Sequence, residues 1–328
     1  MLNGVLFFPI TPFASDDSVD ASALRTHVEN GLKFGPGGVF IACGTGEFHA
    51  LAPDEFATVV RTAVEASAGS APVFAGAGGP LGLAKQLAAS AAEAGADGLL
   101  LMPPYLVSSP ASGLVEYVRA IAASTELPTI VYHRGNARFT EASAVAVSKI
   151  PNVVGLKDGV GDLELMSRII RAVADSVAVT GKEFQFFNGL PTAESSQVAY
   201  RALGINLYSS ATFAFAPEIS VAFYQSLEDG DTELTNSLSR KFFHPLVRLR
   251  DQVPGYAIAL VKAGVALGGI QAGHVRPPLS DISDQHRVEL INILGAGRKV
   301  LDDHRDRLSE LSAPVPVDAT ETLRLISL

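Results

Sequence analysis

Short apolar runs recur along most of the chain, and each is followed by a stretch whose apolar residues repeat at helical spacing. We expect strands at residues 4–8, 39–42, 73–77, 98–102, 129–132, 153–157, 177–180 or 184–187, and 205–209. We expect helices at residues 22–34, 53–67, 83–93, 112–123, 141–148, 163–174 and 193–203, where apolar side chains recur every three or four positions. These eight repeats predict an α/β fold, a closed (β/α)8 TIM barrel with catalytic groups at the carboxyl ends of its strands.

The competing architecture is an open, doubly wound sheet, which carries a glycine-rich phosphate-binding turn after its first strand. Here the first strand runs instead into Pro9-Ile10-Thr11-Pro12-Phe13. Beyond residue 216 the strand pattern stops, and residues 218–227, 232–251, 256–266 and 285–308 are predicted to be helical. We therefore expect a catalytic barrel over residues 1–216 and a C-terminal helical extension over 217–311. The tail over 312–328 is expected to dock on a neighbour or to remain mobile.

Composition narrows the class of protein. The chain has 328 residues, of which 48% are hydrophobic, and this is ample for one large core. Neither a signal peptide nor an apolar run of about 20 residues is present, so we expect a cytoplasmic protein without a membrane partner. Cys43 is the single cysteine, which excludes an intramolecular disulfide and a cysteine-based zinc site. The net charge of -9 argues against nucleic-acid binding. Because the chain is negative overall, an acidic substrate would require local cations.

Lys157 carries the most specific chemistry, because it ends the apolar run that begins at Val153. Most lysines are exposed, and a lysine can also extend its stem over apolar surface to reach solvent. At the carboxyl end of a sixth barrel strand, however, Lys157 would face the catalytic mouth. A lysine amine there can condense with a ketone, and the resulting imine accepts electrons from neighbouring bonds.

The second strand runs into Cys43-Gly44-Thr45-Gly46-Glu47, which is a candidate carboxylate-binding turn. Its backbone amides and the Thr45 hydroxyl could hold an anion, and the alternative is simply a tight strand-to-helix connection. We expect Glu47 to brace the turn. We expect Cys43 to be a small buried thiol, because the sequence offers no base partner that would make it a nucleophile.

Two tyrosines follow other strands. Tyr105 and Tyr132 are both predicted to face the same mouth as Lys157. A phenol in that place can relay a proton to and from a carbinolamine, whereas the alternative is a rim aromatic with its hydroxyl in water. Tyr132 is the stronger candidate.

Further polar residues lie at the remaining strand ends. Arg134 and Arg138 have the planar fork that suits a second carboxylate, although loop arginines are more often solvated. Ser209 and Ser210 could bind substrate oxygens, and Asn188 is a candidate wall of the site. The seven histidines are scattered without a His-Glu-x-x-His pattern, so no metal site is predicted.

Taken together, these motifs resemble the dihydrodipicolinate synthase and N-acetylneuraminate lyase superfamily of lysine Schiff-base barrels. The resemblance covers nearly the whole chain. It rests on Phe8-Pro9-Ile10-Thr11-Pro12-Phe13, Gly44-Thr45-Gly46-Glu47, Pro104-Tyr105, Tyr132, Gly155-Leu156-Lys157-Asp158 and Arg276-Pro277-Pro278-Leu279. It implies catalysis by Lys157 and Tyr132, and substrate binding by Gly44, Thr45, Gly46, Arg134, Asn188, Ser209 and Ser210. It also implies that the imine takes the place of a metal or organic cofactor.

Departures from the synthase pattern indicate a particular branch. The synthases usually have a second hydroxyl residue where this chain has Gly44, and a tyrosine that reaches across a subunit contact where it has Leu106. The sequence is similar to the 5-dehydro-4-deoxyglucarate dehydratase branch, with one mismatch at His133, where an amide side chain is expected. That resemblance implies loss of water and carbon dioxide from a sugar keto-diacid to give 2,5-dioxopentanoate.

Two other functions remain open. A pyruvate-dependent aldolase or lyase would use the same lysine, and a non-catalytic acid-binding barrel would share only the fold. The resemblance also suggests a homotetramer built as a dimer of dimers. Because Leu106 replaces the cross-subunit tyrosine, we expect each subunit to hold a chemically complete site.

Overall fold

Eight parallel strands close into a barrel in which each strand pairs with the next and the last pairs with the first. The computed structural model describes residues 2–312. The strands are β1 (Leu6–Phe7), β2 (Gly38–Ile41), β3 (Val73–Ala77), β4 (Gly98–Leu101), β5 (Thr129–His133), β6 (Val153–Asp158), β7 (Gln185–Asn188) and β8 (Leu207–Ser210). The TIM-barrel prediction is confirmed.

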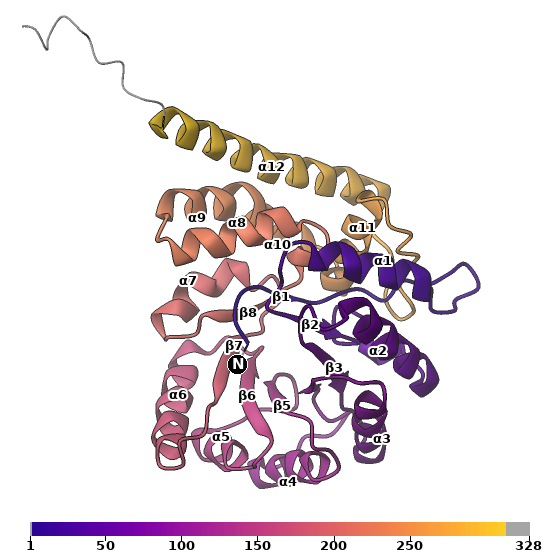
Figure 1. Ribbon diagram of the computed structural model, residues 1–328, viewed down its shortest axis with the longest axis vertical. Helices are drawn as coiled ribbons and strands as arrows, with labels where there is room; N and C mark the ends of the chain where they lie inside the picture. Colours follow the sequence, from indigo (N-terminus) through magenta and orange to yellow (C-terminus); the bar gives the residue numbers. More distant parts are fainter. Residues whose placement is uncertain (1, 313–328) are drawn as a thin grey trace, which may run out of the picture.

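Helices alternate with the strands and surround them (Figure 1). They are α1 (Ala21–Leu32), α2 (Pro53–Ser67), α3 (Leu81–Glu93), α4 (Ala111–Ala122), α5 (Glu141–Ser148), α6 (Leu163–Ala178) and α7 (Glu194–Ala202). Asp162 caps the start of α6, where it accepts a hydrogen bond from Leu165 N at 2.9 Å. Because α6 continues to Ala178, the seventh strand comes from the second of its two candidate segments.

The helical extension contains α8 (Pro217–Glu228), α9 (Thr232–Leu238), α10 (His244–Arg250), α11 (Tyr256–Leu267) and α12 (Asp284–Ser312). The single helix expected over 232–251 is interrupted by a wide π turn at Ser239–Phe243. Pro245 lies in the first turn of α10 and has no N–H to donate, which explains why regular α-helical bonding fails there.

The long helix α12 packs against α8, α9 and α10, on the side of the molecule away from α4 (Figure 1). The predicted boundary at 216/217 falls at the start of α8 and remains a prediction. The tail expected from residue 312 lies, beyond that residue, outside the described part of the chain. No helix within residues 2–312 is long and apolar enough to cross a membrane.

Strand register decides which side chains enter the barrel. Along one row of paired residues, Tyr132 lies beside Lys157, and Lys157 lies beside Phe187. The next row pairs His133, Asp158 and Asn188. Successive strand side chains point to opposite faces, so the first row faces inward and the second faces the helices. Phe8, Phe40 and Phe74 stack inside the barrel with ring centroids 4.7 and 5.0 Å apart, leaving the mouth for a ligand.

Candidate active site

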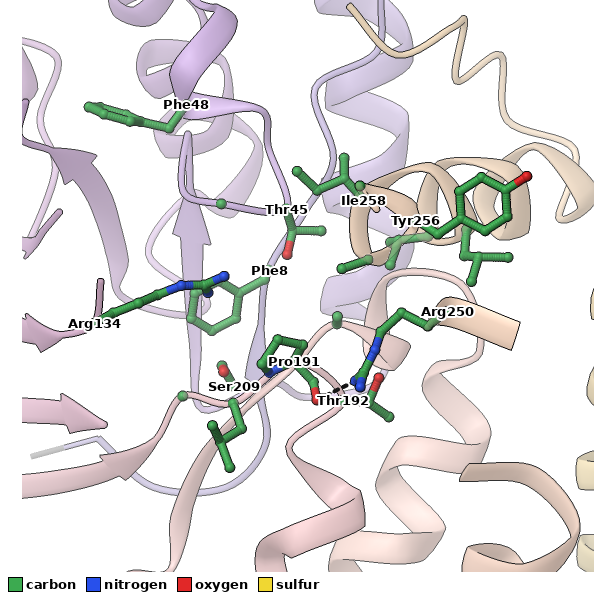
Figure 2. A pocket seen from close by; sticks show the side chains of 18 of the residues that line it. Phe8, Thr45, Phe48, Arg134, Pro191, Thr192, Ser209, Arg250, Tyr256 and Ile258 are labelled. Atoms are coloured by element: carbon green, nitrogen blue, oxygen red, sulfur yellow. Dashed lines mark hydrogen bonds between the residues drawn. The ribbon is translucent and has the colours of Figure 1, made fainter. Parts of the chain in front are cut away.

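A cavity of about 510 Å³ opens between the carboxyl ends of the strands and the helical extension. Its lining includes three cationic side chains, Lys157, Arg134 and Arg250, and no aspartate or glutamate among the described residues. Arg134 and Arg250 reach toward it from opposite sides, with Thr45, Phe8 and Pro191 between them (Figure 2). In a chain of net charge -9, this concentration of positive charge favours an anionic ligand.

Lys157 lines this cavity and is buried, with 6% of its surface exposed. Its Nζ lies 4.5 Å from the centroid of the Phe8 ring and 4.2 Å from that of Tyr132. Within the described residues it forms no ion pair, so no carboxylate competes with a ligand for the amino group. Gly189 provides the necessary space, because a Cβ there would lie 2.6 Å from both Cγ and Cε of Lys157.

Tyr132 pairs with Lys157 across the β5–β6 ladder. Its hydroxyl donates a hydrogen bond to Gly189 O at 2.8 Å and accepts one from Arg134 Nη1 at 2.9 Å. Burial raises the pKa of this phenol, but the nearby charges of Lys157 and Arg134 outweigh burial and hold the pKa below its usual value. The arrangement therefore suits proton transfer beside the lysine.

The turn after β2 presents free donors. The backbone N–H groups of Gly44, Thr45 and Gly46 and the Thr45 hydroxyl have no hydrogen-bond acceptor among residues 2–305. Gly44 and Thr45 line the cavity. Gly46 lies on the other side of the turn, where its carbonyl accepts a hydrogen bond from Thr11 Oγ1 at 2.7 Å. Within the predicted turn, Gly44 and Thr45 therefore line the cavity, and the expectation that Gly46 contacts substrate is wrong.

Glu47 braces this turn, as expected. Its Oε1 accepts a hydrogen bond from Lys262 Nζ at 2.6 Å, and its Oε2 accepts one from Arg276 N at 2.8 Å. Burial lowers the pKa of Lys262, although the charge of Glu47 opposes that shift. Since Lys262 belongs to α11, the helical extension anchors the turn that follows β2.

Ser209 and Ser210 lie on opposite faces of β8. Ser209 lines the cavity, where its hydroxyl makes a long 3.4 Å contact to Asn188 O. Ser210 faces the helices, donating to Glu194 Oε1 at 2.5 Å and accepting from Phe213 N at 3.0 Å. The expectation that Ser210 contacts substrate is therefore wrong, because adjacent residues of a strand cannot share a face.

Asn188 also faces away from the cavity. Its Nδ2 donates to Ala193 O, Ser196 Oγ and Gln197 Oε1, each at 3.0 Å. Its Oδ1 accepts from Leu190 N at 3.2 Å. The prediction that Asn188 forms a wall of the site is wrong, since all its polar atoms are occupied in shaping the loop after β7.

Four other residues that the sequence analysis singled out can be compared with the structure. Tyr105 is 65% exposed and does not line the cavity, so it does not share the mouth with Lys157 as predicted. His133 is structural and accepts a hydrogen bond from Phe139 N at 3.2 Å. Cys43 is buried, and burial raises the pKa of its thiol to about 12, which makes it a poor nucleophile. Arg138 is exposed and also lies outside the lining.

The helical extension supplies lining residues that sequence reasoning missed. Arg250 ends α10 and points into the cavity (Figure 2). Tyr256 begins α11 and lines the cavity, but its hydroxyl points away, 3.0 Å from His286 Nδ1. Thr192, in the loop after β7, completes this wall. Nothing in the local pattern of an arginine at a helix end distinguishes Arg250 from solvated arginines.

The profile of the dihydrodipicolinate synthetase family matches residues 1–296. The chain belongs to this family. Among curated relatives, "Probable 5-dehydro-4-deoxyglucarate dehydratase 1" of Streptomyces coelicolor is 52% identical over 305 residues, covering 93% of this chain and 96% of the relative. "Probable 5-dehydro-4-deoxyglucarate dehydratase" of Streptomyces griseus is 53% identical over 301 residues, covering 92% and 93%.

Solved structures of the dihydrodipicolinate synthetase family agree with the fold. Dihydrodipicolinate synthase from Oceanobacillus iheyensis superposes with a TM-score of 0.83 at 26% identity, covering 91% of this chain and 97% of that one. The Acinetobacter baumannii synthase complexed with pyruvate gives a TM-score of 0.79 at 26% identity, covering 91% and 99%. The site has room for a larger residue at Gly44, because an added Cβ would meet nothing within 4 Å.

Proposed function

We propose that this protein is a lysine Schiff-base lyase that converts 5-dehydro-4-deoxyglucarate to 2,5-dioxopentanoate, carbon dioxide and water. The observation that carries the proposal is the buried Lys157 in a cavity that has two arginines and no acidic side chain. Such a lining suits a ligand with two carboxylates. Relatives with the matching name at 52% and 53% identity support the same substrate.

In the first step, the substrate carboxylate beside the ketone binds the free amides of the turn at Gly44 and the Thr45 hydroxyl. The Lys157 amine attacks the ketone carbon, and a carbinolamine forms. Tyr132 passes a proton to the departing hydroxyl, which leaves as water and yields the protonated imine. Its hydroxyl is held beside Lys157 by Gly189 and Arg134.

In the second step, the imine acidifies the adjacent methylene. Removal of a proton there gives an enamine, whose electrons expel the β-hydroxyl as water and leave a conjugated iminium. Because no acidic side chain lines the cavity, Tyr132 and the substrate's own carboxylate are the candidate bases. The phenol is suited to this work by its lowered pKa.

In the third step, conjugation connects the distal carboxylate to the same electron sink. The bond to that carboxylate breaks, carbon dioxide departs, and the electron pair moves through the new double bond to the iminium nitrogen. Protonation of the resulting enol system gives the aldehyde, and water hydrolyses the imine to restore the ketone and Lys157. The sequence needs neither a second substrate nor an external oxidant, and on this proposal no metal or organic cofactor is required.

Reduction with borohydride in the presence of the keto-diacid tests the proposal. The expected result is a covalent adduct on Lys157 by mass spectrometry, together with carbon dioxide release in a coupled assay. Lys157→Met should yield neither product. Pyruvate release without carbon dioxide would instead support the aldolase alternative, and failure to trap any adduct would favour the non-catalytic barrel.

The proposal includes a homotetramer and a cytoplasmic location. Tyr105, Leu106 and Val107 form an apolar loop after β4 with exposed fractions of 65, 79 and 57%. We expect a second copy of the chain to cover this loop, since a contiguous exposed apolar segment favours association. Light scattering should show the tetramer, and Leu106→Asp should shift it toward smaller species.

A further inference from the structure

A second polar locus lies in the cavity wall formed by the loop after β7 and the helical extension. We propose that Arg250, assisted by Thr192, binds the distal carboxylate of the keto-diacid and selects diacids over monoacids. This inference rests on the proposed function, which leaves the group that holds the distal carboxylate unassigned.

Arg250 is anchored so that part of its guanidinium remains available. Its Nη1 donates to Pro191 O at 2.6 Å, and its Nε donates to Asp251 Oδ1 at 2.8 Å. Its Nη2 has no acceptor among the described residues. The side chain is 17% exposed and lines the cavity, as Figure 2 shows with its hydrogen bond to Pro191. Because two of its nitrogens are already hydrogen-bonded, the guanidinium can bind a ligand through its remaining donors with little further loss of side-chain entropy.

Thr192 adds a hydroxyl beside this fork, because it follows the residue that Arg250 holds. Its side chain lines the cavity, is 7% exposed, and makes no hydrogen bond within the described residues. Its backbone has a φ of 50°, which is costly for a β-branched residue and persists only where neighbouring contacts impose it. The lining position and the unused hydroxyl together make Thr192 available to a ligand.

The other two cations of the cavity are already assigned. Lys157 becomes the imine nitrogen, and Arg134 donates to the Tyr132 hydroxyl at 2.9 Å. Arg250 enters from the side opposite Arg134 (Figure 2). The carboxylate of Asp251 does not cancel its charge, because Asp251 is largely exposed and solvent screens that pair. On this side of the cavity, Arg250 is therefore the cation with a free guanidinium nitrogen for the distal carboxylate.

Two keto acids of equal length isolate this interaction. 2-Oxoadipate and 2-oxohexanoate share the ketone, its adjacent carboxylate and the six-carbon chain, and only 2-oxoadipate has the distal carboxylate. Neither has a β-hydroxyl to eliminate, so both should stop at the imine. Their half-saturation concentrations for borohydride trapping on Lys157 therefore compare binding without the later chemistry.

The variants are Arg250→Gln, Arg250→Lys and the control Arg248→Gln. Arg248 lies on the same helix, is exposed and does not line the cavity, so its replacement removes the same charge elsewhere. We expect the wild type and the control to prefer 2-oxoadipate. Arg250→Gln should lose that preference by about 10- to 100-fold, which is the usual range for a hydrogen bond to a charged group. Arg250→Lys should retain part of it.

Three results would overturn the inference. An unchanged preference in Arg250→Gln would refute the subsite while leaving the proposed function intact. If Arg250→Gln weakened the binding of both keto acids equally, Arg250 would only hold in place the loop that carries Gly189 and Pro191. Failure of the wild type to form an adduct with either acid would instead refute the proposed function, and the subsite with it.

Discussion

Substitution of Gly189 would test how closely the loop after β7 controls the position of Lys157. Replacing it with alanine places a Cβ 2.6 Å from Cγ and Cε of Lys157 and 2.8 Å from Asp158 O. The residue is not among those with positive φ, so alanine is acceptable to the backbone, and the side-chain clash is the perturbation. The lysine stem must therefore move, and because Asp158 O is backbone, the loop at residue 189 must shift as well.

The size of the effect follows from contact distances. Carbon atoms in ordinary contact are about 3.5 to 4.0 Å apart, so the Lys157 stem must move by about 1 Å. A displacement of about 1 Å at a reacting group costs about 100-fold in rate. That factor corresponds to about 2.7 kcal/mol of activation free energy. Overpacking should also lower the free energy of unfolding by about 1 to 3 kcal/mol.

The assay is the rate of adduct formation on Lys157 at saturating 2-oxoadipate, measured beside thermal unfolding. Gly82→Ala is the matched control, because a Cβ at Gly82 in α3 meets nothing within 4 Å. The control should form the adduct at the wild-type rate. If folded Gly189→Ala also reacted at the wild-type rate, the steric account of how Lys157 is held would be wrong.

Three other predictions concern stability, reactivity and assembly. Burial raises the pKa of the Glu194 carboxyl to about 7, so the free energy of unfolding should fall as pH rises from the unfolded pKa through the folded one. The expected loss in the free energy of unfolding is about 3 kcal/mol. Urea unfolding at several pH values should show this loss in the wild type and not in Glu194→Gln. Parallel pH profiles of the two proteins would contradict the buried carboxyl. Cys43 should resist alkylation in the native protein and react on unfolding, whereas rapid native labelling would contradict its burial. Leu106→Ala should retain turnover while folded, and complete loss would refute an independent site in each subunit.

Much of the fold follows from local patterns. The barrel could be predicted because every repeat shows the same pair of patterns. Side chains on one face recur every 2 residues in a strand and every 3.6 residues in a helix. The predicted bounds of helices and strands differ from the structure where the local sequence pattern is ambiguous. Residues 177–180 are as apolar as a strand, yet α6 extends to Ala178. Only pairing with β6 and β8 distinguishes Gln185–Asn188 as the seventh strand.

In the candidate site too, the sequence could assign some residues and not others. Lys157 and Tyr132 could be assigned because each comes at the end of a clear apolar run. Between Ser209 and Ser210 the sequence could not choose, because a shift of one residue reverses the face of every side chain. Asn188 was misplaced for that reason, since its pairing with Asp158 puts it in the outward row.

The sequence by itself determined the repeating strand-helix pattern, the reactive lysine and the turn that follows the second strand, because these are properties of neighbouring residues. The tertiary structure decided which faces point inward and which distant groups meet. Lys262 contacts Glu47 across 215 positions, and Arg250 contacts Pro191 across 59. Such contacts depend on barrel closure and on the docking of the extension, which local periodicity does not encode.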